Sequence, residues 1–389
     1  MTADAPSPAG TGQAVLSEAR VPALAAGATL LGSGGGGEVA TGALLLRGQL
    51  AGAPVPLVAA ARLPAGTLVV HVGLVGAPDV LSERLVEPGD FARAVHAVAD
   101  AAGAPAGAVG VIEVGGLNAL IPVLAAGRLR LPLVDGDLMG RAFPRIDQTV
   151  AGLHGLHPQP FALVGPAGDT VVVPDCTPRL AEPLVRANVL ALGGAAALAL
   201  HPVTAVRLAE VGVTGSLSAC LDLGERFLAS AGAAPEELAA GLGGELLALG
   251  RIEEIVPRHG QTPGSMTLTD RRTGAVVRVD LLDEYLAVTV DGVTRVSSPD
   301  IIAAVDPSGH RPLRTDQVRA GQTLMLLRLP ALYDWPPEAA ALVGPAAFGL
   351  DPEPARPGGA VDGASSAAAG RDAVDGPAAP APSVERRPR

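Results

Sequence analysis

The sequence contains no lysine, since all 28 of its basic residues are arginine. Without lysine the chain can form no Schiff base, anchor no pyridoxal phosphate and build no P-loop, whose lysine contacts the phosphates. Pyridoxal-phosphate and P-loop nucleotide chemistry are therefore excluded. Aromatic residues make up only 2% of the 389 residues, so the core must be built from Leu, Val, Ala and Ile.

Cysteine, long apolar runs and clustered positive charge are also scarce. Two widely spaced cysteines, Cys176 and Cys220, form no disulfide framework, which indicates a reducing compartment. The N-terminus lacks the features of a signal peptide, and the apolar run at 189–200 is too short to span a bilayer. The net charge of −11, with no basic stripe, argues against nucleic acid and against an anionic membrane surface. We therefore expect a cytoplasmic protein that acts on a small molecule; a homo-oligomer stays open.

The length predicts two domains. Residues 1–13 and 354–389 are rich in Pro, Ala, Gly and Ser and are expected to be disordered, because they cannot bury enough apolar surface to offset their ordering entropy. Between them the sequence pattern changes near residue 174. We place the N-terminal domain at 14–174, with the active site, and the C-terminal domain at 175–353.

The N-terminal part alternates β-branched runs with Ala- and Leu-rich stretches, which predicts an α/β domain with a mostly parallel sheet. The expected strands lie at 67–75, 109–114, 131–135, 161–164 and 171–173, and the expected helices at 90–101 and 117–126.

The C-terminal part is predicted to be α+β and rich in antiparallel strands. Helices are expected at 188–200, 217–231 and 235–249, followed by strands at 251–256, 266–268, 276–281, 286–290, 293–296 and 323–327. The Asp291-Gly292 pair between two β-branched runs predicts a hairpin turn.

A glycine-rich loop is the first candidate site. Ser33 stands among five glycines at 32–37, and a helical stretch follows. Such a loop can direct several backbone N–H groups at an anion, a carboxylate or a developing oxyanion. The substrate-binding candidates are Ser33, Gly34, Gly35, Gly36 and Gly37. The alternative is a merely flexible loop in a chain that has 50 glycines.

Two acidic motifs follow predicted strands. In VIEVGGLNALIP (111–122), Glu113 lies near the end of a strand, at the edge where α/β sheets bind ligands, and Asn118 is a further substrate-binding candidate. Glu113 is equally consistent with a helix cap or a structural ion pair.

In LPLVDGDLMGRAFP (131–144), Asp135 and Asp137 stand two residues apart, so in an extended chain they share one face, and Arg141 follows. The two carboxylates are candidates for a proton donor and a base, and Arg141 for binding a substrate carboxylate or lowering an Asp pKa. The alternative is an Asp-Gly-Asp turn. With help from His154, Asp135 and Asp137 are also candidate ligands of a divalent metal. His157 and Cys176 complete the weaker metal-site candidates, and Cys176 is in addition a weak candidate for a nucleophile.

These motifs resemble those of the S-methyl-thiohydantoin desulfurase family. The resemblance rests on GSGGGGE (32–38), EVGGLNALIP (113–122) and VDGDLMGRAFP (134–144), and it continues through TGSLSACLDLGE (214–225), DEYLAV (283–288), SPDIIAAVDPSG (298–309) and VGPAAFGLD (343–351). It covers residues 18–351. Two positions depart from the expected pattern: Arg145 replaces an acidic residue, and Ala-Pro-Asp at 77–79 replaces a Ser-Pro-Thr-like stretch.

The resemblance implies hydrolysis of a cyclic thioimidate, in which water replaces a methylthio group and leaves a hydantoin. It also suggests a functional link to hydantoinase and oxoprolinase enzymes. We expect Asp135 or Asp137 to activate water, Glu113 to hold a ring N–H or act as an acid, and Arg141 to orient the substrate, with a divalent metal as the alternative activator. The rival hypotheses are a non-catalytic partner of a hydantoinase-like enzyme and a hydrolase or isomerase of another hydantoin-like ring.

Overall fold

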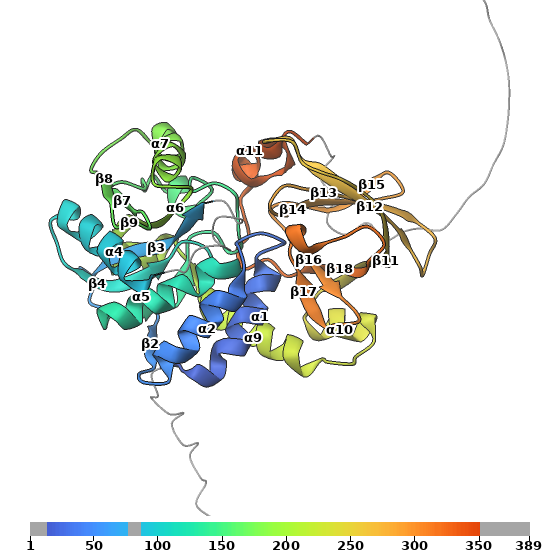
Figure 1. Cartoon of the computed structure of the whole chain (residues 1–389), viewed down its shortest axis with the longest axis horizontal. Coiled ribbons are helices and arrows are strands. Elements are labelled where there is room, and N and C mark those ends of the chain that lie inside the picture. The colour runs from blue at the N-terminus through green and yellow to red at the C-terminus, as the bar shows by residue number, and fades with distance from the viewer. Residues whose placement is uncertain (1–13, 77–86, 351–389) are drawn as a thin grey trace, which may run out of the picture. The chain divides into compact units, whose positions relative to one another are not determined.

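The N-terminal sheet is built around four parallel strands. The computed structural model describes residues 14–76 and 87–350; the ends expected to be disordered lie outside these ranges. In them the sheet has the order β1-β2-β5-β4-β3-β9-β7-β8, with β2, β5, β4 and β3 parallel and the outer neighbours antiparallel (Figure 1). The strands are β1 (Val15–Leu16), β2 (Val55–Val58), β3 (Leu68–Gly76), β4 (Ala106–Val111), β5 (Leu133–Val134), β7 (Phe161–Val164), β8 (Thr170–Val173) and β9 (Ala195–Thr204).

Helices pack against this sheet through apolar faces. The clearest is α4 (Pro88–Ala102), which starts with Pro88 in its first turn, ends at Gly103 in the left-handed region, and packs on β9 and β7. The other α-helices in the described ranges are α1 (Val21–Leu31), α2 (Val39–Leu50), α5 (Ile121–Leu129), α6 (Val150–Leu153), α7 (Pro178–Ala191), α8 (Ala205–Val211), α9 (Ser216–Ala229), α10 (Pro235–Gly241) and α11 (Ala340–Val343).

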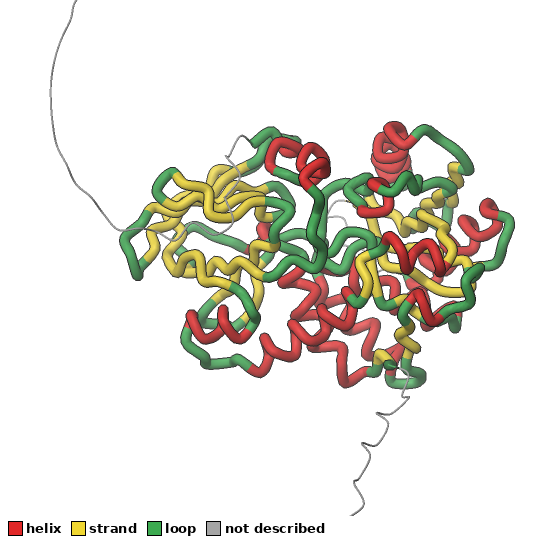
Figure 2. The backbone as a smooth tube through the Cα atoms, turned by 180° about the vertical axis from the view of Figure 1, so that it is seen from behind, coloured by secondary structure: helices red, strands yellow, loops and turns green. Residues whose placement is uncertain are grey.

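The C-terminal sheet is antiparallel throughout. Its order is β15-β14-β13-β12-β11-β18-β16-β17, and Figure 2 shows the strands of both sheets with the helices alongside. The strands are β11 (Glu245–Val256), β12 (Gly264–Asp270), β13 (Val276–Leu281), β14 (Tyr285–Val290), β15 (Val293–Ser297), β16 (Ile301–Asp306), β17 (Arg311–Leu313) and β18 (Thr323–Leu329). The predicted fold class is confirmed, as is the hairpin turn, where Asp291 and Gly292 both have positive φ.

Two of the predicted helices are shorter than expected, and strands follow them. The helix expected at 188–200 ends at Ala191, and Ala195 begins β9, which lies between β3 and β7 in the N-terminal sheet. The first six residues of β9 are all apolar and buried, so this stretch does not show the alternation that marks a half-exposed strand. The helix expected at 235–249 ends at Gly241, and Glu245 begins β11.

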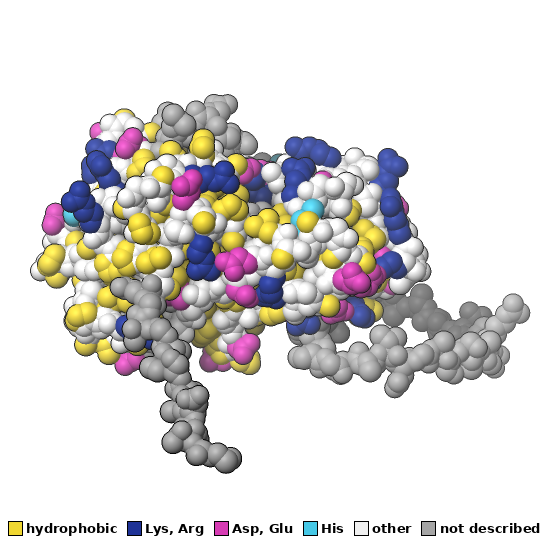
Figure 3. Space-filling model, turned by 90° about the horizontal axis from the view of Figure 1, so that it is seen from below, with side chains coloured by type: hydrophobic (Ala, Val, Ile, Leu, Met, Phe, Trp, Pro, Cys, Tyr) yellow, Lys and Arg dark blue, Asp and Glu magenta, His cyan; other side chains and the backbone are white. Residues whose placement is uncertain are grey.

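One apolar core connects the two sheets. Helices α1 and α9 pack together, and their core extends to Ile301 of β16 and Leu327 of β18. A short ladder of β6 (Gly136–Asp137) with β10 (Val213–Thr214) joins the Asp-Gly-Asp turn to the start of α9. On the face drawn in Figure 3, acidic and basic side chains are interspersed. Among the described helices, none has the length and apolarity that a bilayer crossing requires.

Candidate active site

A cavity of about 130 Å³ lies at the carboxyl ends of β3 and β4, the edge where open α/β sheets bind ligands. By the same measure a single water needs roughly 10–15 Å³, so the cavity has room for a small organic molecule. The described residues that line it are Gly36, Gly37, Leu74, Val75, Gly76, Ile112, Glu113, Leu117, Asn118, Met139, Phe143, Pro144, Arg145, Ile146, Arg186, Leu198, Asp283 and Glu284. Residues from both halves of the chain therefore form one site.

Glu113 lies two residues after β4 ends at Val111, and its carboxyl group is almost fully buried. One oxygen accepts a hydrogen bond from Asn118 Nδ2 at 2.7 Å, and the other from the Phe143 N–H at 3.1 Å. Burial raises the Glu113 pKa to about 7, although these hydrogen bonds oppose the shift. The carboxyl group thus exchanges protons near neutral pH.

Glu284 contributes a second acid to the same wall, from the residue that precedes β14. Its side chain is buried, and within the described residues no other residue donates a hydrogen bond to its carboxyl group. Burial, and then repulsion from Asp283 and Glu113, raises the Glu284 pKa to about 8. Glu284 is therefore largely protonated at neutral pH.

Close packing explains why the loop before α2 needs its glycines. A Cβ on Gly35 would lie 2.3 Å from Glu284 Oε1, and one on Gly36 would lie 2.7 Å from the Gly115 carbonyl oxygen. Gly34, Gly36 and Gly37 also have positive φ, which favours glycine. Gly36 and Gly37 line the cavity, whereas Gly35 makes room for the acid.

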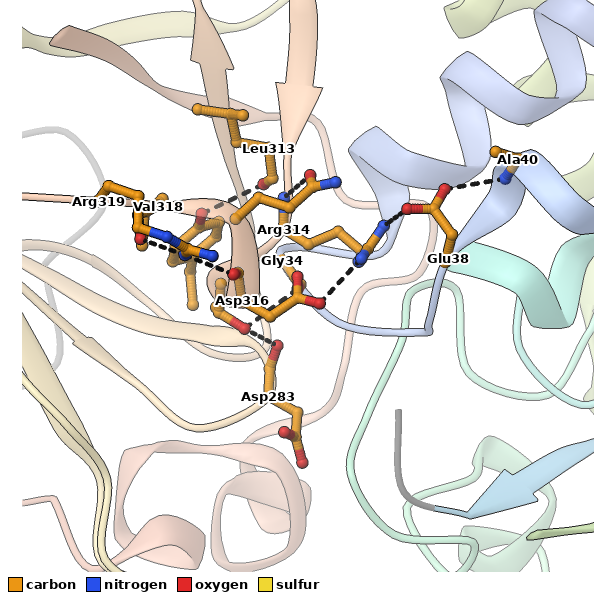
Figure 4. A network of polar contacts seen from close by, with 12 residues as sticks. Gly34, Glu38, Ala40, Asp283, Leu313, Arg314, Asp316, Val318 and Arg319 are labelled. Atoms are coloured by element: carbon orange, nitrogen blue, oxygen red, sulfur yellow. Dashed lines mark hydrogen bonds and ion pairs between the residues drawn. The ribbon is translucent and has the colours of Figure 1, made fainter. Parts of the chain in front are cut away.

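The glycine loop is fastened to the C-terminal sheet. Ser33 is fully buried and its hydroxyl bonds to both the carbonyl and the N–H of Ile302, at 2.8 and 3.1 Å, so the structure places it in packing rather than in the cavity wall. Beyond the glycines, Arg314 lies between Glu38 and Asp316 (Figure 4). Burial would raise the Glu38 pKa, but hydrogen bonds from Arg314 and the Ala40 N–H outweigh it and lower the pKa.

Asp137 supports the loop around it. Its carboxyl group is fully buried, and one oxygen accepts hydrogen bonds from the N–H groups of Val114, Met139 and Gly140 at 2.8–3.1 Å. Burial raises the Asp137 pKa to about 6, opposed by these hydrogen bonds. Asp137 lies outside the cavity wall, so its position favours an organising role over the expected water activation.

Asp135 points elsewhere. Its two oxygens accept hydrogen bonds from the N–H and hydroxyl of Ser218, at 3.0 and 2.6 Å, in the first turn of α9. The carboxylate thus satisfies a donor at a helix N-terminus. The structure does not bring Asp135 into the wall with Glu113.

Arg141 is buried beside the wall rather than in it. Its guanidinium donates to the carbonyls of Ala142 and Asp300 and lies 5.0 Å from the centre of the Phe143 ring. Burial lowers its pKa to about 10, while Glu284, Asp300 and Glu113 oppose the shift. Arg141 therefore acts on the two acids through its charge.

The metal-site candidates do not gather. Within residues 14–76 and 87–350, no three His, Cys, Asp or Glu side chains are grouped as metal ligands would be. His154 follows α6, where its carbonyl accepts from Arg207, and Cys176 is half-buried. The departing segment Ala77–Asp79 lies outside the described residues.

Sequence reasoning missed Glu284, Arg145 and Arg186 in the wall. Arg186 donates to Glu182 and to the Pro144 carbonyl, and Arg145 donates to Asp147. Glu284 belongs to the DEYLAV motif (283–288), but the sequence gives no sign that this motif lies near β4. The folded structure places Glu284, which precedes β14, in the same wall as Glu113.

The comparisons with known proteins agree with this architecture. A crystal structure of a protein from Chromobacterium violaceum is similar, with a TM-score of 0.66 and 23% identity over 82% of this chain and 92% of that one, which supports the fold alone. Comparison with curated proteins gives no match. Residues 19–175 match the model of the S-Me-THD-like N-terminal domain, and residues 176–356 match that of the S-Me-THD-like C-terminal domain. The chain therefore belongs to the S-methyl-thiohydantoin desulfurase-like family.

Proposed function

We propose that the protein hydrolyses an S-methyl-thiohydantoin or a closely related cyclic thioimidate, giving a hydantoin and methanethiol. One observation carries the proposal: two buried carboxyl groups with raised pKa, Glu113 and Glu284, line one cavity of small-molecule size. Titratable groups that face one cavity and whose pKa values burial has shifted toward neutrality are characteristic of acid–base sites. The S-Me-THD-like family match supports the choice of substrate.

The pKa values suggest which acid has which role. Burial and charge repulsion raise the pKa of Glu284 further than that of Glu113, so we assign Glu284 as the proton donor and Glu113 as the base. In the first step water attacks the ring carbon that carries the methylthio group. Glu113 accepts a proton from the water, and Glu284 gives its proton to the ring nitrogen. The result is a tetrahedral ring carbon that bears OH, SCH3 and the two ring nitrogens.

In the second step the C–S bond breaks. The leaving sulfur takes the proton held by Glu113, and the hydroxyl proton returns to Glu284 as the carbonyl forms. Both acids recover their starting states, and one water has become the hydantoin oxygen, the ring N–H and the thiol proton. Between the two steps Glu284 is ionised. The buried charge of Arg141 stabilises this ionised form, because Arg141 interacts with both acids through its charge.

The test is methanethiol release by the purified protein supplied with 2-methylthio-imidazol-4-one, measured with a thiol reagent together with hydantoin formation. Glu284→Gln and Glu113→Gln should each lower kcat by about 100-fold or more. Glu225→Gln, which removes an exposed carboxylate of α9, is the matched control and should be unaffected. Two results would reject the proposal. In one, neither the wild type nor Glu225→Gln releases methanethiol; in the other, the wild type and all three variants turn over at the same rate.

A further inference from the structure

Asn118 joins the end of β3 to Glu113. Its Oδ1 accepts from the Leu74 N–H at 2.7 Å, and its Nδ2 donates to the Leu74 carbonyl at 3.1 Å and to Glu113 Oε1 at 2.7 Å. A side-chain amide has two N–H donors, and both are used in these contacts. Asn118 was expected to bind substrate, but its donors serve the protein itself.

The amide continues a β ladder. Strand β3 pairs with β4 only as far as Val72 opposite Val111, while its pairing with β9 runs on to Gly76. Beyond Val111 the chain leaves the sheet, and the peptide groups of Leu74 would lack a partner on that side. Asn118 supplies one, so the position of its side chain is fixed by the backbone of the sheet.

Glu113 receives its orientation from this fixed amide. The second carboxyl oxygen is held by the Phe143 N–H, so both oxygens have a defined donor. Of the described residues, Asp137, Arg141 and Glu284 act on Glu113 through their charge, and Arg145, Arg186 and Asp283 line the same cavity. Asn118 is the only side chain in the described part of the chain that donates a hydrogen bond to it.

We propose that Asn118 is a positioning residue that acts through Glu113: anchored on Leu74, its amide holds the Glu113 carboxylate in the orientation that accepts a proton from water. The proposal rests on the proposed function for the proton transfer, but the hold on Glu113 can be measured without turnover. A donor to the ionised carboxylate also favours that form.

The first experiment follows Glu113 directly. In protein labelled with ¹³C at the glutamate carboxyl groups, the resonance absent from Glu113→Gln identifies Glu113, and its midpoint is expected near pH 7. Asn118→Ala should raise that midpoint by about one pH unit. Asn188→Ala, which removes an amide-to-carbonyl bond to Leu184 within α7, is the matched control and should leave it unchanged. An unmoved midpoint in Asn118→Ala overturns the proposal, whatever the protein's substrate proves to be.

The second experiment separates positioning from substrate binding. Asn118→Ala should lower kcat/KM about tenfold at pH 7 and shift the acid limb of the kcat/KM profile to higher pH. In the Glu113→Gln background the same substitution should change kcat/KM by less than about twofold, because residues that act as one unit are not additive. A full tenfold loss in that background, expressed in KM, would show that Asn118 binds substrate instead.

If Asn118→Ala does not fold, Asn118→Asp takes its place. It keeps an acceptor for the Leu74 N–H but places a carboxylate against Glu113, so the midpoint should rise further. A midpoint equal to that of the wild type in Asn118→Asp contradicts the proposal.

Discussion

The Asp-Gly-Asp turn and the cavity wall both contain buried acids with raised pKa, yet they differ in what surrounds the carboxyl groups. Asp137 has three peptide N–H donors on one oxygen and no surface in the cavity. Glu284 lies in the wall, and among the described residues no neighbour donates to it. A raised pKa therefore indicates burial, whereas a buried carboxyl group that lines a cavity and accepts no hydrogen bond from a described neighbour is a candidate for catalysis.

The largest effect on stability is expected at Asp137. Asp137→Ala leaves three buried N–H groups without their acceptor, which should lower the free energy of unfolding by on the order of 4 kcal/mol. Denaturant unfolding measures this loss. A loss below about 1 kcal/mol would show that Asp137 does not organise the loop and would weaken the contrast with Glu284.

Gly35→Ala tests the link between the glycine loop and the acid. The new Cβ would lie 2.3 Å from Glu284 Oε1, so the carboxyl group must move and turnover should fall by about tenfold or more. Gly48→Ala adds the same methyl group in α2, where nothing lies within 4 Å, and should leave turnover unchanged. Equal activity of the two variants would contradict the role given to Gly35.

Glu284 should make stability depend on pH. Its pKa rises from the ordinary value of about 4.5 to about 8 on folding. Between these values the unfolded state binds fewer protons, so the free energy of unfolding falls as pH rises. Glu284→Gln removes the ionisation that destabilises the folded wild type at high pH. The Tm of the variant should therefore exceed that of the wild type by several degrees at pH 9 but not at pH 4. A difference in Tm that does not change with pH would show that Glu284 ionises normally.

Asp135→Asn is expected to have the smallest effect. The amide oxygen can still accept from the Ser218 N–H, so stability should fall by about 1 kcal/mol or less and turnover should stay within about twofold. A 100-fold loss of turnover in a folded variant would show that Asp135 takes part in catalysis. Asp135 could then no longer be separated from the acids of the cavity wall.

Local sequence patterns predicted the kind of each sheet, most of the strands, the glycine loop and the place of Glu113 near a strand end, because strand composition and turn residues act over short distances. The strands β1, β2, β16 and β17 were not predicted. The patterns also did not predict β9, whose buried sequence lacks alternation, nor Glu284, which reaches the cavity only through the packing of the C-terminal sheet. The two aspartates illustrate the same limit. A spacing of two predicted one shared face, yet the β6 ladder turns Asp135 to α9 and Asp137 to the peptide groups of its own loop.

The pH dependence of kcat/KM for methanethiol release tests the central claim most directly. If ionised Glu113 and protonated Glu284 act together, the profile should be a narrow bell with limbs near the apparent pKa values of about 7 and about 8. The alkaline limb should disappear in Glu284→Gln, whose residual activity should be about 100-fold lower. A wild-type profile that is flat from pH 6 to 9, or an alkaline limb that persists in Glu284→Gln, would contradict the account.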